Sequence, residues 1–169
     1  MIKFFIYFVI VQLFLFSMER LNVVRQLFII PFTQIIAQIS VWFVHLFDQN
    51  VISSGTILQH IGSGFSVSIE SGCNGIEALI VLISAMIVFP TTWKFKIKGI
   101  LIGFFAVEIL NIARIITLFY LGQWNQEIFD WAHLYIWEAL IMLDILIIFI
   151  WWMRTLPVVS SQTTDTHAV

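Results

Sequence analysis

Charged residues are scarce in this sequence, at 11% of its 169 residues, whereas 60% are hydrophobic. Such a composition excludes an intrinsically disordered protein and argues against an ordinary soluble domain. Eight basic and ten acidic residues give a formal net charge of −2, which is too balanced to indicate a nucleic-acid partner. Nothing in the chain resembles a zinc site or a phosphate-binding loop.

Cysteine is rarer still, because Cys73 is the only one. A single cysteine cannot form an intramolecular disulfide, so the chain gives no sign of its redox compartment. Cys73 is therefore either an inert packing residue or a lone reactive thiol. The sequence contains no internal repeat.

Long apolar runs are abundant. A helix needs about 20 apolar residues to cross roughly 30 Å of hydrocarbon, and charged residues, glycine and proline separate five such segments. The predicted spans are 2–16, 27–47, 75–89, 97–121 and 133–153. We therefore predict an all-α fold, a polytopic transmembrane helical bundle of about five spans, that forms one integral membrane domain over residues 1–156. The remaining residues, 157–169, are predicted to be a disordered cytoplasmic tail.

Basic residues predict the orientation, because they resist translocation across the membrane. Six of them fall on one side if the N-terminus faces out and the C-terminus faces in: Arg20, Arg25, Lys94, Lys96, Lys98 and Arg154. The loops on the opposite side, 48–74 and 122–132, contain no Lys or Arg, and Lys3 is the only dissenting cation. Apolar and polar residues alternate over 65–70, which predicts a short extended segment in the first of these outer loops.

Ionisable side chains at membrane depth are costly, so each needs a partner or a task. Arg114 and Glu138 fall about 10 and 7 Å below the outer ends of the fourth and fifth predicted spans, so they can face one another. Asn111 shares a helix face with Arg114 and can orient its guanidinium. For Glu108 and Asp144, interhelical polar contacts are the simpler interpretation. Arg114 cannot neutralise itself by losing a proton, which favours a functional role.

The segment Glu70-Ser71-Gly72-Cys73-Asn74-Gly75 places the thiol at the outer start of the third predicted span. Either Ser71 or Asn74 can cap the following helix, and a nearby helix N-terminus favours the thiolate. The flanking glycines leave backbone amides open to a substrate carbonyl, as an oxyanion site requires. A single cysteine in a membrane helix is usually inert, but the position at the aqueous edge favours the reactive alternative.

Two histidines compete for the role of acid and base. His133 lies at the outer start of the fifth predicted span, at the membrane level of Cys73, although it also fits an interfacial aromatic belt. His60 lies in the outer loop, before Cys73. Acyl transfer needs an activated nucleophile, a proton donor for the leaving amine and a cationic donor for the oxyanion. Cys73, His133 and Arg114 can fill these three roles.

These residues resemble a known family. The order Glu70-Ser71-Gly72-Cys73-Asn74-Gly75, then Asn111-Ile112-Ala113-Arg114-Ile115, then Ala132-His133 is similar to that of the exosortase/archaeosortase family, over roughly residues 70–153. The chain is shorter than typical exosortases, which carry additional N-terminal spans. Its compactness and the segments 118–122 and 133–137 look most like the small exosortase H subfamily, which is associated with IPTL-type C-terminal signals.

The resemblance implies a thiol protease or transpeptidase of the bacterial cytoplasmic (inner) membrane whose active site faces the periplasm or exterior. Its substrates would be exported proteins with a C-terminal motif, a transmembrane helix and a basic cluster. Cys73 would attack the scissile carbonyl, His133 would protonate the departing amine, and Arg114 would stabilise the oxyanion. The thioacyl enzyme would then pass the product to water or an amine, and no metal or organic cofactor is needed. Supporting roles are expected for Glu70, Asn74, Gly75, Asn111 and Glu138.

Two alternatives come from other functional classes. In a non-catalytic membrane scaffold, Cys73 is packing and Arg114 pairs with Glu138 for structural reasons. In a small transporter, Glu108, Asp144 and Arg114 line a path through the membrane. The scaffold predicts that Cys73→Ser leaves function intact, and the transporter predicts that neutralising Glu108 or Asp144 does more harm than changing Cys73.

Overall fold

Helices dominate a computed structural model of the protein, which describes residues 2–156. The helical elements are α1 (Ile2–Glu19), α2 (Asn22–Val24), a π-helical turn (Arg25–Ile29), α3 (Ile30–Val44), α4 (Ile76–Val88), α5 (Trp93–Trp124), α6 (Gln126–Trp131), a second π-helical turn (Ala132–Ile136) and α7 (Trp137–Arg154). Each of the five predicted apolar segments is largely helical, and the predicted transmembrane helical bundle is confirmed. The predicted tail, 157–169, lies outside the described residues.

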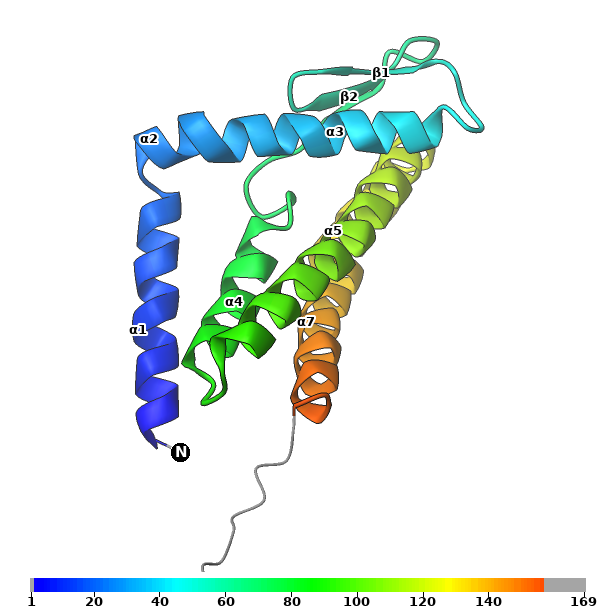
Figure 1. The fold of residues 1–169 in the computed structure, drawn as a ribbon. Coiled ribbons are helices and arrows are strands. Elements are labelled where there is room, and N and C mark those ends of the chain that lie inside the picture. Colours follow the sequence, from blue (N-terminus) through cyan, green and yellow to red (C-terminus); the bar gives the residue numbers. More distant parts are fainter. Residues whose placement is uncertain (1, 157–169) are drawn as a thin grey trace, which may run out of the picture.

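Four helical stretches are long and apolar enough to cross a membrane: α1, Asn22–Val44, α5 and Gln126–Arg154. The apolar helix α4 is shorter, with 13 residues. At 1.5 Å per residue it measures about 20 Å, which is less than the roughly 30 Å of the hydrocarbon layer. Figure 1 shows α4 beginning inside the molecule, below α3. The loop before α4 therefore enters the bundle as irregular backbone.

Four helices run up and down the molecule, and one lies across their upper ends (Figure 1). The upright helices are α1, α4, α5 and α7; α1 packs on α4, and α4, α5 and α7 pack on one another. Helix α3 crosses above them and contacts α5 and the strands. Its buried residues, which include Thr33, Ala37 and Ser40, recur at a helical spacing, as expected for a helix that packs through one face.

The two described chain ends lie at the same end of the molecule, because α1 starts and α7 finishes there (Figure 1). The sequence predicts that the N- and C-termini face opposite sides of the membrane, which stays a prediction, but the described ends lie together. The cause is α3, which belongs to the predicted span 27–47 but lies across the bundle instead of running with it. Helix α5 also starts at this lower end, so Lys3, Lys94, Lys96, Lys98 and Arg154 gather there. Arg20 and Arg25 lie at the upper end, where α1 ends and the crossing helix begins.

A small antiparallel sheet covers the outer side of α3. It contains β1 (Val51–Ser54), β2 (Ile57–His60) and β3 (Ser66–Ser68) in the order β1-β2-β3. The alternating segment predicted to be extended includes β3. Strands β1 and β2 were not predicted, because each has only four residues and such a short segment shows little alternation of apolar and polar residues. They are joined by a turn at Gly55, whose φ of +63° suits glycine.

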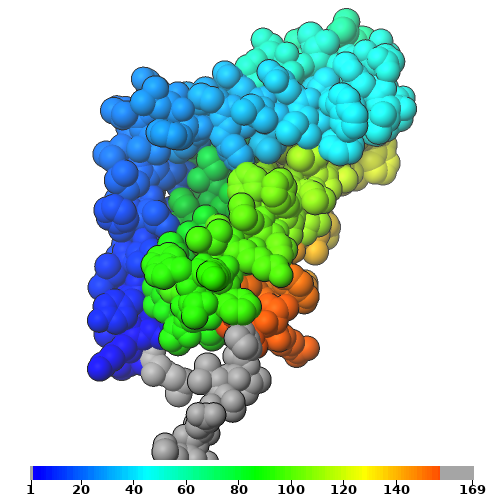
Figure 2. Space-filling model, in the orientation of Figure 1, coloured from blue at the N-terminus to red at the C-terminus, as the bar shows by residue number. Residues whose placement is uncertain are grey.

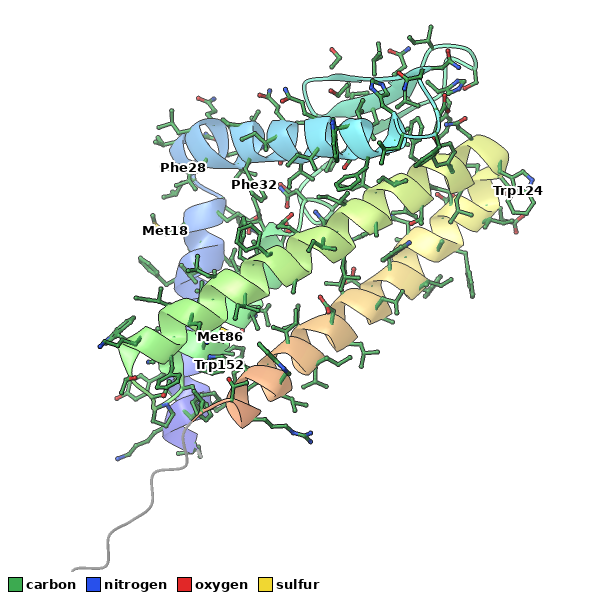
Figure 3. All side chains as sticks on the ribbon, turned by 45° about the vertical axis from the view of Figure 1, so that its right-hand side comes forward. Met18, Phe28, Phe32, Met86, Trp124 and Trp152 are labelled. Atoms are coloured by element: carbon green, nitrogen blue, oxygen red, sulfur yellow. The ribbon has the colours of Figure 1, made fainter. Side chains whose placement is uncertain are left out.

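The hydrophobic core has two parts. The upper cluster packs α3 and the sheet against the upper part of α5, around Phe119, Val44 and Leu58. The lower cluster packs α4 and α7 against the lower part of α5, around Leu82, Met86 and Trp152. Figure 3 shows Met86 and Trp152 near one another in the lower part. The cysteine loop, which we define as residues 70–75, lies between the outer sheet and α4.

Candidate active site

The cysteine loop contains two glycines, one on each side of Cys73, whose backbone conformation other residues rarely adopt. Gly72 has φ +90° and Gly75 has φ +82°, both in the left-handed region. Gly75 occupies the N-cap position of α4. Asn74 supports the loop from both sides, because its Oδ1 accepts from the Ile76 N–H at 3.2 Å and its Nδ2 donates to Thr33 Oγ1 at 3.1 Å.

The expected helix cap therefore differs in detail from the structure. Neither Ser71 nor Asn74 is the N-cap residue, since Gly75 holds that place and offers no side chain. Asn74 still binds an otherwise free first-turn N–H, one residue further from the helix than a true cap. Its side chain ties the loop to α3 as well, a contact that spacing along the sequence does not reveal.

The side chains of His133 and Arg114, from distant parts of the chain, both lie beside the Cys73 sulfur. Cys73 Sγ lies 3.0 Å from His133 Nε2. Arg114 Nη2 lies 3.7 Å from the same sulfur, and Nη1 donates to the Gly72 carbonyl at 3.3 Å. The Arg114 side chain is buried, whereas Cys73 is partly exposed. The sequence-based prediction that these three residues share one membrane level thus corresponds to direct contact.

The three residues line a small cavity of about 140 Å³, here called the cysteine cavity. Its remaining walls come from β3, the cysteine loop, α5 and α6: Val67, Ser68, Ile69, Glu70, Ile115, Leu118 and Phe129. Most of these side chains are apolar. A reacting group inside the cavity would therefore meet one thiol, one imidazole and one guanidinium in surroundings that contain little water.

Burial raises the pKa of the Cys73 thiol. Arg114 acts in the opposite direction, while the carboxylates of Glu77, Glu138 and Glu70 reinforce the rise. The expectation that a helix N-terminus favours the thiolate stays a prediction, because the causes of this rise are burial and the nearby charged side chains. The raised pKa favours the protonated thiol, so a base must remove its proton when it reacts.

His133 is held against the thiol by its local backbone and by an aromatic neighbour. It lies in the π-helical turn Ala132–Ile136, a geometry that often occurs at functional sites. Its ring stacks on Phe129, with ring centroids 5.7 Å apart and an interplanar angle of 14°. Neither the π-helical turn nor the contact with Phe129 could be predicted from residue spacing.

His60 lies elsewhere and contacts other residues. Its Nε2 is 3.5 Å from Asp48 Oδ2, and its Nδ1 accepts from the Ser63 N–H at 2.9 Å. The N–H of Asn50 and the nearby His60 hold the pKa of Asp48 below its usual value. His60 therefore belongs to a polar cluster on the outer loops, and the structure brings His133, not His60, to Cys73.

Glu108 and Asn111 lie beneath the cysteine loop and are both buried. Asn111 Nδ2 donates to Glu108 Oε2 at 3.4 Å. The expected contact of Asn111 with Arg114 is therefore replaced by a contact with Glu108. Both side chains press on Gly75, where an added Cβ would lie 2.6 Å from Glu108 Oε1. Within residues 2–156, Glu108 Oε1 and Asn111 Oδ1 have no hydrogen-bond partner. Glu108 is thus part of the floor of the loop, which sequence reasoning missed.

Two further predicted supporting residues, Glu70 and Glu138, lie near the thiol in different ways. Glu70 borders the cysteine cavity and accepts from Ser68 Oγ at 2.7 Å. Glu138 borders a second cavity together with Arg114. Among the described residues, the only ion pair within 4.0 Å joins His60 and Asp48, so the expected Arg114–Glu138 pair is not formed. No cluster of three or more potential metal ligands occurs in residues 2–156.

Comparison with known proteins gives one match. The family model described as transmembrane exosortase (Exosortase_EpsH) matches residues 2–151 of the chain. No curated protein and no solved structure matches it. The matched region includes the cysteine loop, Arg114 and His133.

Proposed function

The chain belongs to the transmembrane exosortase family, and from that premise we propose that it is a cysteine transpeptidase which cleaves C-terminal sorting signals of exported proteins. The substrate is a membrane-anchored protein with a short motif, a transmembrane helix and a basic cluster. The supporting observation is the contact of Cys73 Sγ with His133 Nε2 at 3.0 Å, with Arg114 Nη2 beside the same sulfur.

The first half of the reaction forms a thioester. As Cys73 Sγ attacks the scissile carbonyl carbon, its proton passes to His133 Nε2, since burial keeps the resting thiol protonated. When the tetrahedral intermediate collapses, the C–N bond breaks and His133 returns the proton to the departing amine. His133 therefore acts as base and then as acid, as in other nucleophile–imidazole pairs.

Arg114 stabilises the negative charge that develops on the carbonyl oxygen. Its guanidinium is buried, permanently charged and fixed by the bond to the Gly72 carbonyl. A fixed cation in a site with little water costs no reorganisation when the oxyanion forms. The second half reverses these roles: an acceptor amine or water attacks the thioester, its proton passes to His133, and Cys73 leaves as the thiol.

We further propose that the cysteine loop faces the outside of a bacterial inner membrane. The lower end carries Lys3, Lys94, Lys96, Lys98 and Arg154, and basic residues are retained on the cytoplasmic side. Because α3 lies across the bundle, Lys3 is at the same lower end as the other four basic residues and agrees with this rule. Arg20 and Arg25 then face outward, close to the loop. Assignment to the exosortase H subfamily stays a prediction.

The two alternative functions have less support. A transporter would place Glu108 and Asp144 along a path with Arg114, yet neither residue borders the two cavities that Arg114 borders. A scaffold would leave the contact of Cys73 with His133 without a purpose. Neither alternative explains why a buried guanidinium lies beside the only thiol of the chain.

Trapping the thioacyl intermediate tests the proposal. The purified chain is mixed in liposomes with a membrane-anchored reporter that carries an IPTL-type motif, an apolar helix and a basic cluster. We expect a covalent adduct between the chain and the N-terminal product, which hydroxylamine releases. Cys73→Ala should insert normally but form no adduct and no product, whereas the control His60→Ala should retain cleavage. Normal cleavage by Cys73→Ala would refute the proposal.

A further inference from the structure

A second cavity, of about 360 Å³, is bordered by Arg114 and lies between α1, α4 and α7. We call it the lateral groove. Its apolar walls are formed by Phe16, Ala78, Val81, Ile141, Met142 and Ile145. Its polar part is formed by Gln12, Gly72, Gly75, Glu77, Arg114 and Glu138. The apolar walls come from upright helices, whereas Gly72 and Gly75 belong to the cysteine loop.

The lateral groove is bordered by helices that are poorly covered by the rest of the protein. No residue of α1 is buried, and the contacts of α1 are concentrated on α4. Helix α7 buries only Ile148 and Trp152. On its groove side, Met142 is 68% exposed. In a membrane these exposed apolar surfaces meet lipid or another apolar segment, so the groove is accessible from within the bilayer.

The lateral groove and the cysteine cavity meet at Arg114, which borders both. Gly72 also borders the groove, and its carbonyl holds the guanidinium at 3.3 Å. A polypeptide that runs from the groove into the cysteine cavity must therefore pass Arg114. There it comes beside the Cys73 sulfur, 3.7 Å from Nη2.

Polar atoms at this junction have unused hydrogen-bonding capacity. Within residues 2–156, Glu77 Oε2 and Arg114 Nε are buried without a partner, and both residues border the groove. One is an acceptor and the other a donor. In hydrocarbon every backbone N–H and C=O needs a partner. An extended peptide that leaves a membrane helix at this point exposes both kinds of group and can use both atoms.

We propose that the lateral groove binds the transmembrane helix of the substrate, and that the extended segment before this helix crosses Arg114 into the cysteine cavity. This inference rests on the proposed function and adds the place where the substrate binds. The helix packs on the apolar walls, so its outer end places the scissile carbonyl at Cys73. Because the cysteine cavity is small and mostly apolar, the residues on the acyl side of the cleaved bond are small and apolar.

A second apolar hollow provides a natural control. The front recess, of about 390 Å³, is bordered by α1, the Asn22–Val44 helix, α4 and α5, with Met18, Phe28 and Phe32 among its residues. Figure 2 shows it as a hollow beneath α3, and Figure 3 shows these three side chains where α1 meets the crossing helix. It is more apolar than the lateral groove, and Arg114, Gly72 and Cys73 do not border it.

Site-directed photocrosslinking distinguishes the two hollows. Cys73 is the only cysteine, so Cys73→Ala gives a background without thiols in which the substrate remains uncleaved. Met142→Cys in the lateral groove and Phe28→Cys in the front recess then carry a benzophenone. The native side chains are 68% and 69% exposed, so the two probes are equally accessible. The partner is the liposome reporter with its motif, apolar helix and basic cluster.

We expect the reporter helix to crosslink several-fold more from Met142→Cys than from Phe28→Cys. Equal yields, a preference for Phe28→Cys or no crosslink at either position would overturn the inference. Cleavage of the same reporter by the wild-type chain is measured separately. Cleavage without a Met142→Cys crosslink refutes only the groove, whereas a Met142→Cys crosslink without cleavage refutes the proposed reaction and leaves a helix-binding site.

A blocking variant gives a second, independent measurement. Ala78→Phe fills the lateral groove, and Ile80→Phe adds bulk beside the front recess. We expect Ala78→Phe to raise KM for the reporter several-fold while small maleimides still label Cys73 at the wild-type rate. Ile80→Phe should leave both quantities unchanged. An unchanged KM in Ala78→Phe would contradict the inference.

Discussion

The two halves of this protein treat buried polar groups in opposite ways. In the lower cluster, the buried Trp152 satisfies its Nε1–H on the Phe95 carbonyl at 3.1 Å and packs against Phe89, with ring centroids 5.5 Å apart. Toward the upper half, buried side-chain atoms of the described residues remain without partners: Ser40 Oγ, Glu77 Oε2, Glu108 Oε1, Asn111 Oδ1, Arg114 Nε and Gln123 Nε2.

This difference indicates a division of labour. Unpartnered buried polar atoms cost free energy, and native proteins keep few of them. Here four of them, on Glu77, Glu108, Asn111 and Arg114, belong to residues that contact or border the cysteine loop and the lateral groove. The lower half, with its satisfied tryptophan and close apolar packing, supplies the stability that this arrangement costs. Substitutions in the two halves should therefore separate stability from activity.

The largest effect is expected from Trp152→Ala in the lower cluster. Trp152 is 2% exposed and packs against Gly99, where an added Cβ would lie 2.2 Å from its ring nitrogen. Truncating a buried aromatic side chain costs about 3–5 kcal/mol. We expect a loss of this size in unfolding by denaturant in micelles, with cleavage per folded molecule unchanged. A large loss of cleavage per folded molecule would contradict the proposed difference between the halves.

Arg114→Lys should show the opposite behaviour in the upper half. An ammonium group cannot reach the Gly72 carbonyl and the oxyanion together as a guanidinium fork does. We expect reporter cleavage to fall by about 10²–10³-fold, the usual effect of losing one oxyanion donor. The melting temperature should change little. Near-normal turnover would reduce Arg114 to a structural cation.

Gly75→Ala and Gly72→Ala form a matched pair with an intermediate effect. Both positions have positive φ, so alanine is strained at each, by about 1–3 kcal/mol. Only at Gly75 does the new methyl group also collide with Glu108 Oε1, while nothing lies within 4 Å at Gly72. We expect Gly75→Ala to lose more cleavage and more Cys73 labelling than Gly72→Ala. Equal losses of cleavage and labelling in the two variants would show that Glu108 does not support the loop.

Glu70→Gln should produce the smallest change, a shift in the pH dependence of Cys73 alkylation. The Glu70 carboxylate contributes to the raised pKa of the thiol, so removing its charge lowers that pKa. More thiolate is then present at a given pH, and the alkylation rate should rise at lower pH than in the wild type. Arg114→Ala should shift the profile the other way, toward higher pH. Profiles that do not move would show that these charges do not reach the thiol.

Hydropathy and residue chemistry predicted much of this structure for clear physical reasons. Long apolar runs form helices wherever the chain must satisfy its backbone in lipid. Membrane depth follows from the rise per residue, which is why Cys73, Arg114 and His133 could be assigned to one level. The same arithmetic cannot give the direction of a helix, so the crossing of α3 was missed. The side of the membrane that Arg20 and Arg25 face stays a prediction.

Details that depend on contacts across the fold were also beyond the sequence. Glu108 lies beneath Gly75 because α5 packs against the start of α4, and no rule of sequence spacing predicts that contact. The raised pKa of Cys73 reflects burial first, and the Glu77, Glu138 and Glu70 carboxylates add to the rise while Arg114 opposes it. The partner of Asn74 on α3 was equally invisible. Each of these features is set by tertiary packing and not by local propensity.

The π-helical turn Ala132–Ile136 makes activity sensitive to a very small genetic change. A π turn holds one residue more than an α turn, so deleting Leu134 would convert it to an α turn that leaves α6 and α7 in phase but repositions His133, which lies inside the turn. His133 would swing away from the thiol, while hydropathy and length still suit a membrane span. A one-codon deletion would thus abolish the proposed activity and leave a gene whose motifs all read as intact.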